Sequence, residues 1–437
     1  MRTHVLVVAA LGVVASTRGA NCQSRPIAVR QLPRPDVESP PDLVASIAAL
    51  RATVSGHVFI NDIVRRQVVL LDSSLHLVRV VTDGEGTRAR YGNGATGLFA
   101  FSGDSTLFLS GASLSIAVMD ANGRVARIMA PPRPSDFGQL IGGAAGNPAF
   151  DARQRLVYRS AGPGMAERIR LGELGAAPPP DSAALVRFDF RTRALDTLTY
   201  VRIYTPRVVP KTVQQGKSVT TWLSQILNPM PLVDDWAVLS DGRVAVLRGV
   251  DYHVDFYDAN GVRSSGPKVQ FPWRHLSTED KAALLDSSRA LRARLTAEGI
   301  GVSRGIAPAP GMEPLTSTST SVNRSVGGGQ ISPATSDGPP AEYVAPDELP
   351  DYQPAFAVGS LRADQDGRIW VRTISPTPLS GGAIYDVLDA RGKLIDRIQV
   401  PRNSAIAGFS PGGIVYLVQR DDARLSIKRC RYQPPVQ

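Results

Sequence analysis

Arginine recurs at the end of short apolar segments that are expected to form β-strands. Arg159 ends QRLVYR, Arg248 ends GRVAVLR, Arg372 ends GRIWVR and Arg420 ends GIVYLVQR, while Asp62 holds the related place after VFIN. If these strand ends face the centre of a ring, they form a basic rim suited to a carboxylate, phosphate or sulfate. The alternative interpretation is a set of solvated surface arginines. The predicted ligand-binding residues are therefore Arg159, Arg248, Arg372, Arg420 and Asp62.

Two motifs match catalytic patterns but lie in the wrong setting. Residues 92–97 read G-x-G-x-x-G, which binds a dinucleotide only between a strand and a helix. Residues 408–412 read G-x-S-x-G, the nucleophile elbow, which also needs a helix after the turn. In both cases an apolar strand segment follows, so both are interpreted as loops or turns. No catalytic residue is predicted from them.

Metal chemistry has little support in the sequence. Apart from His4, the histidines are His57, His76, His253 and His275, and none has H-x-H or H-E-x-x-H spacing. Asp364-Gln-Asp366-Gly resembles part of a calcium loop but lacks the later carboxylate. The sequence predicts no cofactor and no bound metal.

A repeat positions the arginine-ended segments. The stretch from Gly56 to Val81 reads as three short strands, and its first strand returns five times, beginning near residues 105, 154, 242, 367 and 412. The second half, an apolar strand closing on an aspartate and a turn, gives Asp72, Asp120, Asp189, Asp258 and Asp389. With an inner strand expected at residues 43–50, each unit has four strands. Six such units predict an all-β, six-bladed β-propeller of four-stranded antiparallel blades.

The insertions between repeats fall where one face of such a propeller would receive them. They occupy residues 161–180, 204–230, 272–352 and 374–382, either between the second and third strands of a unit or at the crossover to the next unit. Tight turns such as Asp120-Ala-Asn-Gly123 lie at the opposite face. We therefore expect function on the face that carries the insertions, called here the decorated face.

The largest insertion has a helical part and a low-complexity part. Residues 277–298 carry Ser277 as a cap and Asp280 three residues later, with Gly299 as the stop. From Ser303 to Pro346 the composition turns to Pro, Ser, Thr and Gly, which is typical of disorder. Whether the helix covers the channel is left open.

The amino terminus has the layout of a secretory signal. Arg2 precedes an apolar run over residues 5–15, too short to span a bilayer, and small residues follow. The predicted organisation is a signal peptide over 1–20, a closing strand and Pro-rich spacer over 21–41, and the propeller over 42–437 with the insertion at 272–352. Loss of Arg2 and Arg18 lowers the formal charge from +10 to +8. The scattered basic residues argue against nucleic acid and for an anionic ligand or surface.

Closure of the ring requires a strand for the last repeat, which shows only three. Residues 24–32 are predicted to supply it beside residues 424–432. This pairing would bring Cys22 near Cys430, where an oxidising compartment allows a disulfide. Two unpaired thiols, or a Cys22 that is lost with the signal or lipidated, remain alternatives.

The repeat resembles the bacterial six-bladed propellers related to NHL-repeat and TolB-like proteins. The stretches that carry the resemblance are Leu239 to Gly261, Ala363 to Arg372 and Tyr385 to Pro401, and the likeness covers residues 42–433 apart from the insertions. It implies the fold more specifically than a function, because propellers host both binders and enzymes.

The leading functional prediction is an exported binding or interaction scaffold, periplasmic or extracellular, and the sequence leaves open whether it is also an enzyme. It is expected to be monomeric, without a transmembrane segment, and to bind a protein, a peptide or an anionic small molecule at the decorated face. The alternative is a metal-dependent hydrolase or lactonase similar to gluconolactonase-type propellers, in which Glu, Asn and Asp side chains from separate blades hold one divalent cation. Its candidate ligands are Asn61, Asp62, Asp235 and Asp251.

Overall fold

The computed structural model describes most of the repeat and part of the insertions. The described residues are 27–81, 91, 96–162, 179–215, 218–297, 342–376, 380–421 and 424–435. The predicted signal, Cys22 and the low-complexity segment up to residue 341 lie outside the described residues.

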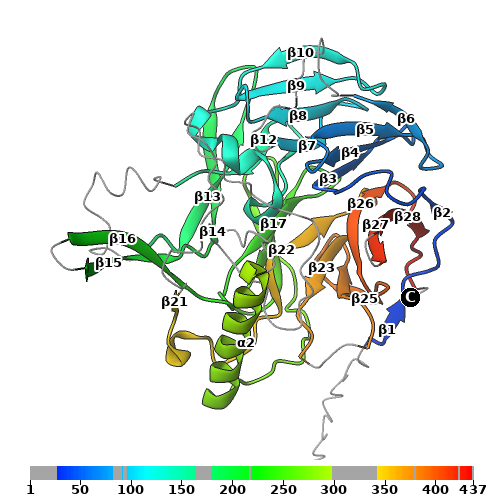
Figure 1. Cartoon of the computed structure of the whole chain (residues 1–437). Helices are drawn as coiled ribbons and strands as arrows, with labels where there is room; N and C mark the ends of the chain where they lie inside the picture. The colour runs from blue at the N-terminus through cyan, green and yellow to red at the C-terminus, as the bar shows by residue number, and fades with distance from the viewer. Residues whose placement is uncertain are drawn as a thin grey trace, which may run out of the picture.

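Antiparallel sheets of four consecutive strands make up the body of the molecule (Figure 1). The first three are β3 (Ala49–Ala52), β4 (Val58–Asp62), β5 (Gln67–Leu71) and β6 (Leu77–Val80); β7 (Thr96–Ala100), β8 (Thr106–Ser110), β9 (Ser115–Met119) and β10 (Val125–Met129); and β11 (Ala149–Phe150), β12 (Leu156–Arg159), β13 (Ser182–Phe188) and β14 (Leu195–Arg202).

The later sheets repeat the same order. They are β17 (Asp235–Val238), β18 (Val244–Arg248), β19 (His253–Tyr257) and β20 (Arg263–Ser265); β22 (Phe356–Ala363), β23 (Ile369–Thr373), β24 (Ile384–Leu388) and β25 (Leu394–Gln399); and β26 (Ser404–Ser410), β27 (Ile414–Asp421) and β28 (Arg424–Arg431).

The first strands of these sheets lie next to one another around the centre of the molecule. Strand β3 contacts both β26 and β7, while β11 contacts β7 and β17, and β17 contacts β22. Figure 1 shows the fourth strands, such as β6 and β10, on the outside. Radially repeated four-stranded sheets whose last member returns to the first form a β-propeller.

The closing strands differ from the prediction. Strand β1 (Val29–Gln31), which falls in the segment expected beside β28, instead pairs in parallel with β25 as a fifth strand. Arg30 explains the choice, because its guanidinium pairs with the buried carboxylate of Asp396, and Gln31 Nε2 also donates to Gln399 Oε1 at 2.7 Å. The predicted pairing of residues 24–32 with residues 424–432 is therefore wrong.

The Pro-rich spacer, and not the predicted strand, borders β28. Strand β2 (Val37–Glu38) pairs antiparallel with it, and the amides of Asp36, Ser39 and Asp42 donate to β28 carbonyls at 2.8–2.9 Å. The inner strand of the first sheet likewise begins at Ala49 instead of residue 43.

The predicted Asx turns are confirmed. Asp120 Oδ1 accepts hydrogen bonds from the amides of Asn122 and Arg124 at 2.9 and 2.8 Å. Gly123 has φ of +75°, a conformation that glycine adopts without steric cost. Asp258 and Asp389 make the same contacts in their own turns, so local sequence alone fixes these connections.

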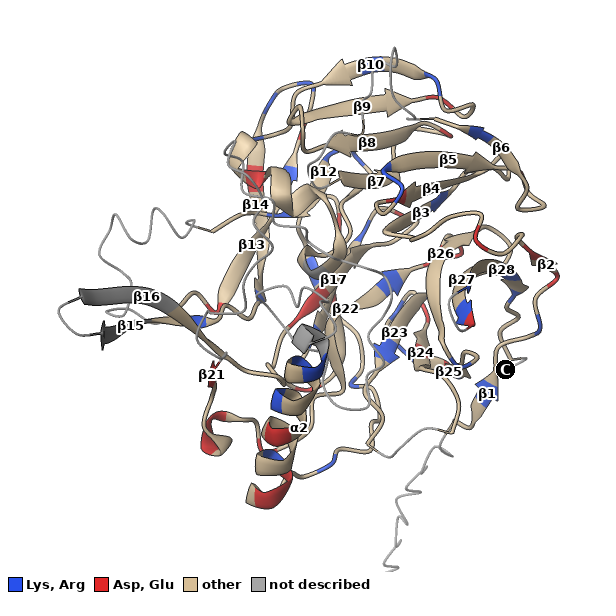
Figure 2. Cartoon of the chain, in the orientation of Figure 1, with Lys and Arg blue, Asp and Glu red and all other residues tan. Residues whose placement is uncertain are grey.

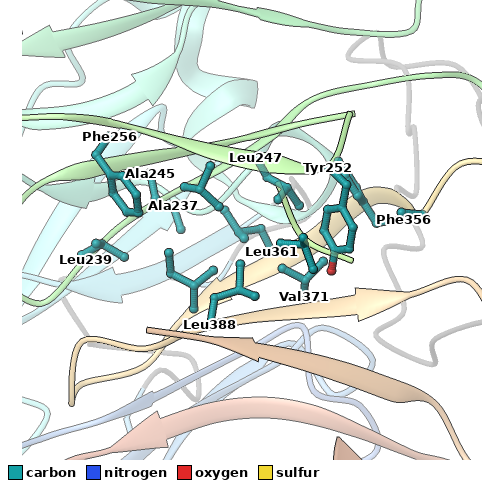
Figure 3. Packing of buried hydrophobic residues seen from close by; sticks show 14 residues of the cluster. Ala237, Leu239, Ala245, Leu247, Tyr252, Phe256, Phe356, Leu361, Val371 and Leu388 are labelled. Atoms are coloured by element: carbon teal, nitrogen blue, oxygen red, sulfur yellow. The ribbon is translucent and has the colours of Figure 1, made fainter. Parts of the chain in front are cut away.

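Apolar side chains fill the space between neighbouring sheets. In Figure 3, Leu247 and Tyr252 from one sheet meet Leu361 and Val371 from the next, and all are buried. Alternation along each strand sends successive side chains to opposite faces, so every strand contributes to two such interfaces. The sheets therefore stabilise one another and form one continuous ring.

The described parts of the insertions form separate elements. Strands β15 (Arg207–Gln215), β16 (Ser218–Leu227) and β21 (Glu342–Tyr343) make a three-stranded sheet outside the ring. Helix α2 (Thr278–Ala297) matches the predicted helix, and Ser277 and Asp280 exchange the reciprocal hydrogen bonds of a capping box at 3.1 Å. The 3-10 helix Pro346–Glu348 also belongs to an insertion, whereas the 3-10 helices Pro134–Leu140 and Gly143–Ala145 lie between β10 and β11.

Helix α2 packs against residues outside the helix. Leu285 packs with Met230, Leu276 and Leu349 in a small apolar cluster. Within the described ranges, no helix is both long and apolar enough to cross a membrane.

Candidate functional site

A small cavity lies on the decorated face, where β12 and β14 end and β17 begins. Its volume is about 80 Å³. Since one molecule of liquid water occupies roughly 30 Å³, the cavity suits a group of a few heavy atoms. Its polar or ionisable lining side chains are those of Arg159, Arg202, Tyr204, Asp234, Asp235 and Trp236.

Asp235 is the buried acid of this cavity. It is the first residue of β17, and only 3% of it is exposed. Its carboxylate accepts hydrogen bonds from the amides of Leu361 and Trp236 at 2.8 and 2.9 Å. Burial outweighs these bonds and raises its pKa to about 6, so protonation occurs in a mildly acidic medium.

Two arginines from different sheets oppose Asp235. Arg159, half-buried at the end of β12, donates from Nε to Gln139 Oε1 at 3.1 Å. Burial lowers the pKa of Arg159 and of Arg362, and the charge of Asp235 acts against that decrease in both. The charge of Arg372 adds to the decrease at Arg362.

Arg248 belongs to the wall beside the cavity. Its guanidinium contacts Asp234 at 2.8 Å and Asp255 at 2.7 Å, and Asp255 is fully buried. Asp234 also accepts from the amides of Arg202 and Gly249 at 3.0 Å. Because protein carboxylates already occupy Arg248, its evident role is to hold the ends of β14, β17 and β18 together.

The remaining predicted residues lie apart from the cavity. Asp62 is fully buried and accepts from Ser46 Oγ and the amide of Ala45 at 2.9 Å, which organises the approach to β3. Arg420 is half-buried near the end of β27, and its amide donates to Asn403 at 3.0 Å. Of the predicted residues, Arg159 lines the cavity together with Asp235, and Arg248 contacts Asp234 beside them. Ligand binding by any of these residues stays a prediction.

The candidates of the hydrolase alternative have separate partners. Asn61 accepts a hydrogen bond from Tyr91 Oη at 2.5 Å, and Asp251 contacts His253 Nδ1 at 2.6 Å and Lys268 Nζ at 3.0 Å. Among the described residues, no three His, Cys, Asp or Glu side chains are grouped as metal ligands.

The two motifs interpreted as loops are not followed by helices. Residues 96–100 form β7, and Ser410 ends β26 ahead of a turn into β27. Cys430 is 1% exposed on β28, and burial raises its pKa to about 11. Its predicted disulfide partner, Cys22, lies outside the described residues, so that pairing stays a prediction.

The sequence analysis did not predict that Arg362 would lie near Asp235 or that Gln139 would bond Arg159. Arg362 stands inside β22, whose register shifts between Phe356 and Leu361, and this irregularity brings the amide of Leu361 to Asp235. Gly359, with φ of +75°, lies in this irregular stretch. A glycine inside an expected strand is the sequence signal for such a bulge.

Comparison with known proteins does not assign this chain to a family. No protein-family model matches the chain, and no curated protein matches it. A Bacteroides vulgatus member of the DUF4221 family is 12% identical over 92% of this chain and 96% of that chain, with a TM-score of 0.42.

Two enzymes give comparable structural matches. Virginiamycin B lyase from Staphylococcus aureus is 8% identical over 90% of this chain and 98% of that chain, with a TM-score of 0.36. A gluconolactonase from Xanthomonas campestris is 11% identical over 95% of this chain and 100% of that chain, also with a TM-score of 0.36. Because all three scores are below 0.5, the β-propeller assignment rests on the sheet topology.

Proposed function

We propose that this chain is an exported six-bladed β-propeller that binds an anionic ligand on its decorated face. The repeat count in the sequence and the sequence of contacts among β3, β7, β11, β17, β22 and β26 support six blades. The apolar run near the amino terminus supports export. The single observation that carries the binding role is the cavity in which Arg159 and Asp235 come together.

The chemistry of the cavity favours one small anionic group. Arg159 supplies a half-buried guanidinium, and Arg202 supplies an exposed one at the rim. Charge-assisted hydrogen bonds from guanidinium to carboxylate or phosphate are the strong ones in proteins. A cavity of about 80 Å³ accommodates the anionic head while the rest of the ligand stays outside.

The protonation state of Asp235 sets the net charge of the cavity. Above a pH of about 6 this acid is ionised and competes with the ligand for Arg159; below it, the competition ends. We expect anion affinity to increase as the pH falls from 7.5 to 5. The test uses sulfate, whose charge is constant over this range. The variant Asp235→Asn should bind sulfate equally at both pH values, and a wild type without pH dependence would contradict this role.

The binding proposal is tested with defined anions. Citrate, succinate and inorganic phosphate are titrated into the purified protein at pH 5, and binding is read by isothermal calorimetry. At least one should bind the wild type, and Arg159→Gln should weaken it about tenfold, which is the loss of one charge-assisted bond. Arg391→Gln, in an exposed turn, is the matched control. Equal binding by Arg159→Gln, or no binding of any probe to the wild type, would overturn the proposal.

A further inference from the structure

A second groove lies away from the decorated-face cavity, between β10 and the turn that joins β13 to β14. Its volume is about 340 Å³, and its lining residues are Arg127, Met129, Ala130, Phe190, Arg191 and Arg193. Met129, Ala130 and Phe190 contribute apolar surface, and the three arginines contribute positive charge. No acidic side chain among the described residues lines the groove.

The guanidinium groups of this protein differ in their partners. Several pair with aspartates, as Arg155 does with Asp151 and Arg368 with Asp364. Within the described part of the chain, none of the groove arginines makes an ion pair with a carboxylate. Their contacts are of other kinds. The guanidinium of Arg127 lies 5.9 Å from the centre of the Phe101 ring. That of Arg193 lies 4.7 Å from the centre of the Phe188 ring and donates to the carbonyls of Pro131 and Pro132 at 3.2 Å. The amide of Arg191 donates to Asp189 Oδ1 at 2.7 Å, and this bond and the charge of Arg191 help to lower the pKa of Asp189.

The groove also borders a strand edge. Strand β10 pairs with β9 on one side, and no strand of the described chain pairs with its other side. Arg127 and Met129 alternate along β10 with Ile128, so they lie on one face and Ile128 on the other. Ile128 is 50% exposed, which leaves apolar surface beside the edge.

Two other sheets show that an outer edge of this propeller accepts another strand. The fourth strand β25 receives β1 in parallel register, and β28 receives β2 in antiparallel register. In the first case a side-chain ion pair, Arg30 with Asp396, accompanies the backbone pairing. An edge strand with unpaired backbone groups is a template for an extended peptide.

We propose that β10 and the adjoining groove bind an acidic peptide as an added β-strand. Backbone groups of the peptide pair with the edge of β10, while acidic side chains on one face contact Arg127, Arg191 and Arg193. Apolar side chains on its other face cover Ile128. This site is independent of the anion cavity near Asp235, because the two share no lining residue.

The test uses a fluorescein-labelled hexapeptide of alternating glutamate and leucine, with binding read by fluorescence anisotropy. The expected result is saturable binding that weakens at least tenfold in the double variant Arg127→Glu, Arg191→Glu. Both side chains are exposed, so the variant should keep its thermal midpoint. Arg79→Glu, on the outer strand β6 of the first sheet, is the matched control and should bind as the wild type does.

Two further peptides separate the contributions of charge and backbone. An alternating lysine and leucine peptide should not bind, and a glutamate and leucine peptide with N-methyl groups on alternate amides should lose at least tenfold in affinity. Binding that survives the double variant, or that is equal for the N-methylated peptide, would overturn the added-strand proposal. Absence of binding by the parent peptide would overturn it as well.

Discussion

At the scale of single residues, charged side chains are spread over the described chain (Figure 2), and several of those predicted to bind a ligand serve the fold instead. Arg248 and Asp62 were predicted as ligand residues because of their places at strand ends. Their hydrogen bonds instead connect strands and turns within the protein. A buried carboxylate needs such partners, since burial of an unpaired charge costs several kcal/mol.

Removal of Arg248 should therefore destabilise the protein. Arg248→Met keeps the apolar stem but leaves the fully buried Asp255 and the nearby Asp234 with fewer partners. We expect a loss of about 3 kcal/mol in the free energy of unfolding, measured by denaturant titration. Arg420→Met, at the related strand end without a described ion pair, should cost less than about 1 kcal/mol. A similar small loss in both variants would contradict the structural role of Arg248.

Asp235 should give the stability a distinctive pH dependence. Its folded pKa of about 6 lies above the ordinary value of 3.8, so the folded state holds the proton more tightly than the unfolded chain does. Stability from this group is complete below pH 3.8 and is lost as the pH rises through 6. The difference amounts to at most about 3 kcal/mol. The measurement is the free energy of unfolding between pH 4 and 7, and the contribution of Asp235 to its pH dependence should be absent from the variant Asp235→Asn.

At the scale of elements, the added strands depend on contacts that distant parts of the chain provide. Leu32, just after β1, is 7% exposed and packs in a cluster with Trp370 and Tyr432. Its amide also donates to the carbonyl of Gln399 at 2.9 Å. Strand β1 is short, so these contacts, together with Arg30 and Gln31, determine where it docks.

Truncation of Leu32 tests that docking. Leu32→Ala should lower the unfolding free energy by about 2 kcal/mol because it removes buried apolar volume. Hydrogen exchange of the amides in β1 should accelerate more than exchange in the central strand β23. Val29→Ala, at a 47% exposed position of the same strand, is the control and should change little. Uniform acceleration across the sheet would show that β1 is not a separately docked element.

At the scale of the whole molecule, the amino-terminal segment connects the last sheets of the ring. Residues 36–42 border β28 through three backbone hydrogen bonds, and Ser39 Oγ accepts one more from the amide of Ile427 at 3.0 Å. Arg429 also bonds the carboxylate of Asp36 at 2.9 Å and the carbonyl of Ser73 at 2.7 Å, so β28 is tied to the first sheet.

Deletion of residues 27–42 should weaken closure of the ring. We expect a lower thermal midpoint and a broader calorimetric transition, because β28 loses its outer partner and neighbouring sheets stabilise one another less. Deletion of residues 27–34 removes β1 but keeps β2, and it should preserve a single transition. If both deletions behave alike, closure by residues 36–42 is not what maintains cooperativity.

The sequence by itself determined the repeating four-stranded unit, the Asx turns and helix α2. These features depend on residues close together in the chain: alternating apolar side chains, Asp and Gly in turns, and the Ser277–Asp280 capping box. It also located the decorated face, because insertion positions follow from strand order. The same local pattern predicted that Arg159 ends a strand, as it ends β12.

Only the tertiary structure decided where β1 and β2 pair, and which charges meet. Leu361 reaches Asp235 from 126 residues away in sequence, and Arg30 reaches Asp396 from 366 residues away. Local patterns do not encode such distances, since any short apolar segment can join several strand edges. The choice among them depends on buried carboxylates and apolar side chains that come together only when the ring closes.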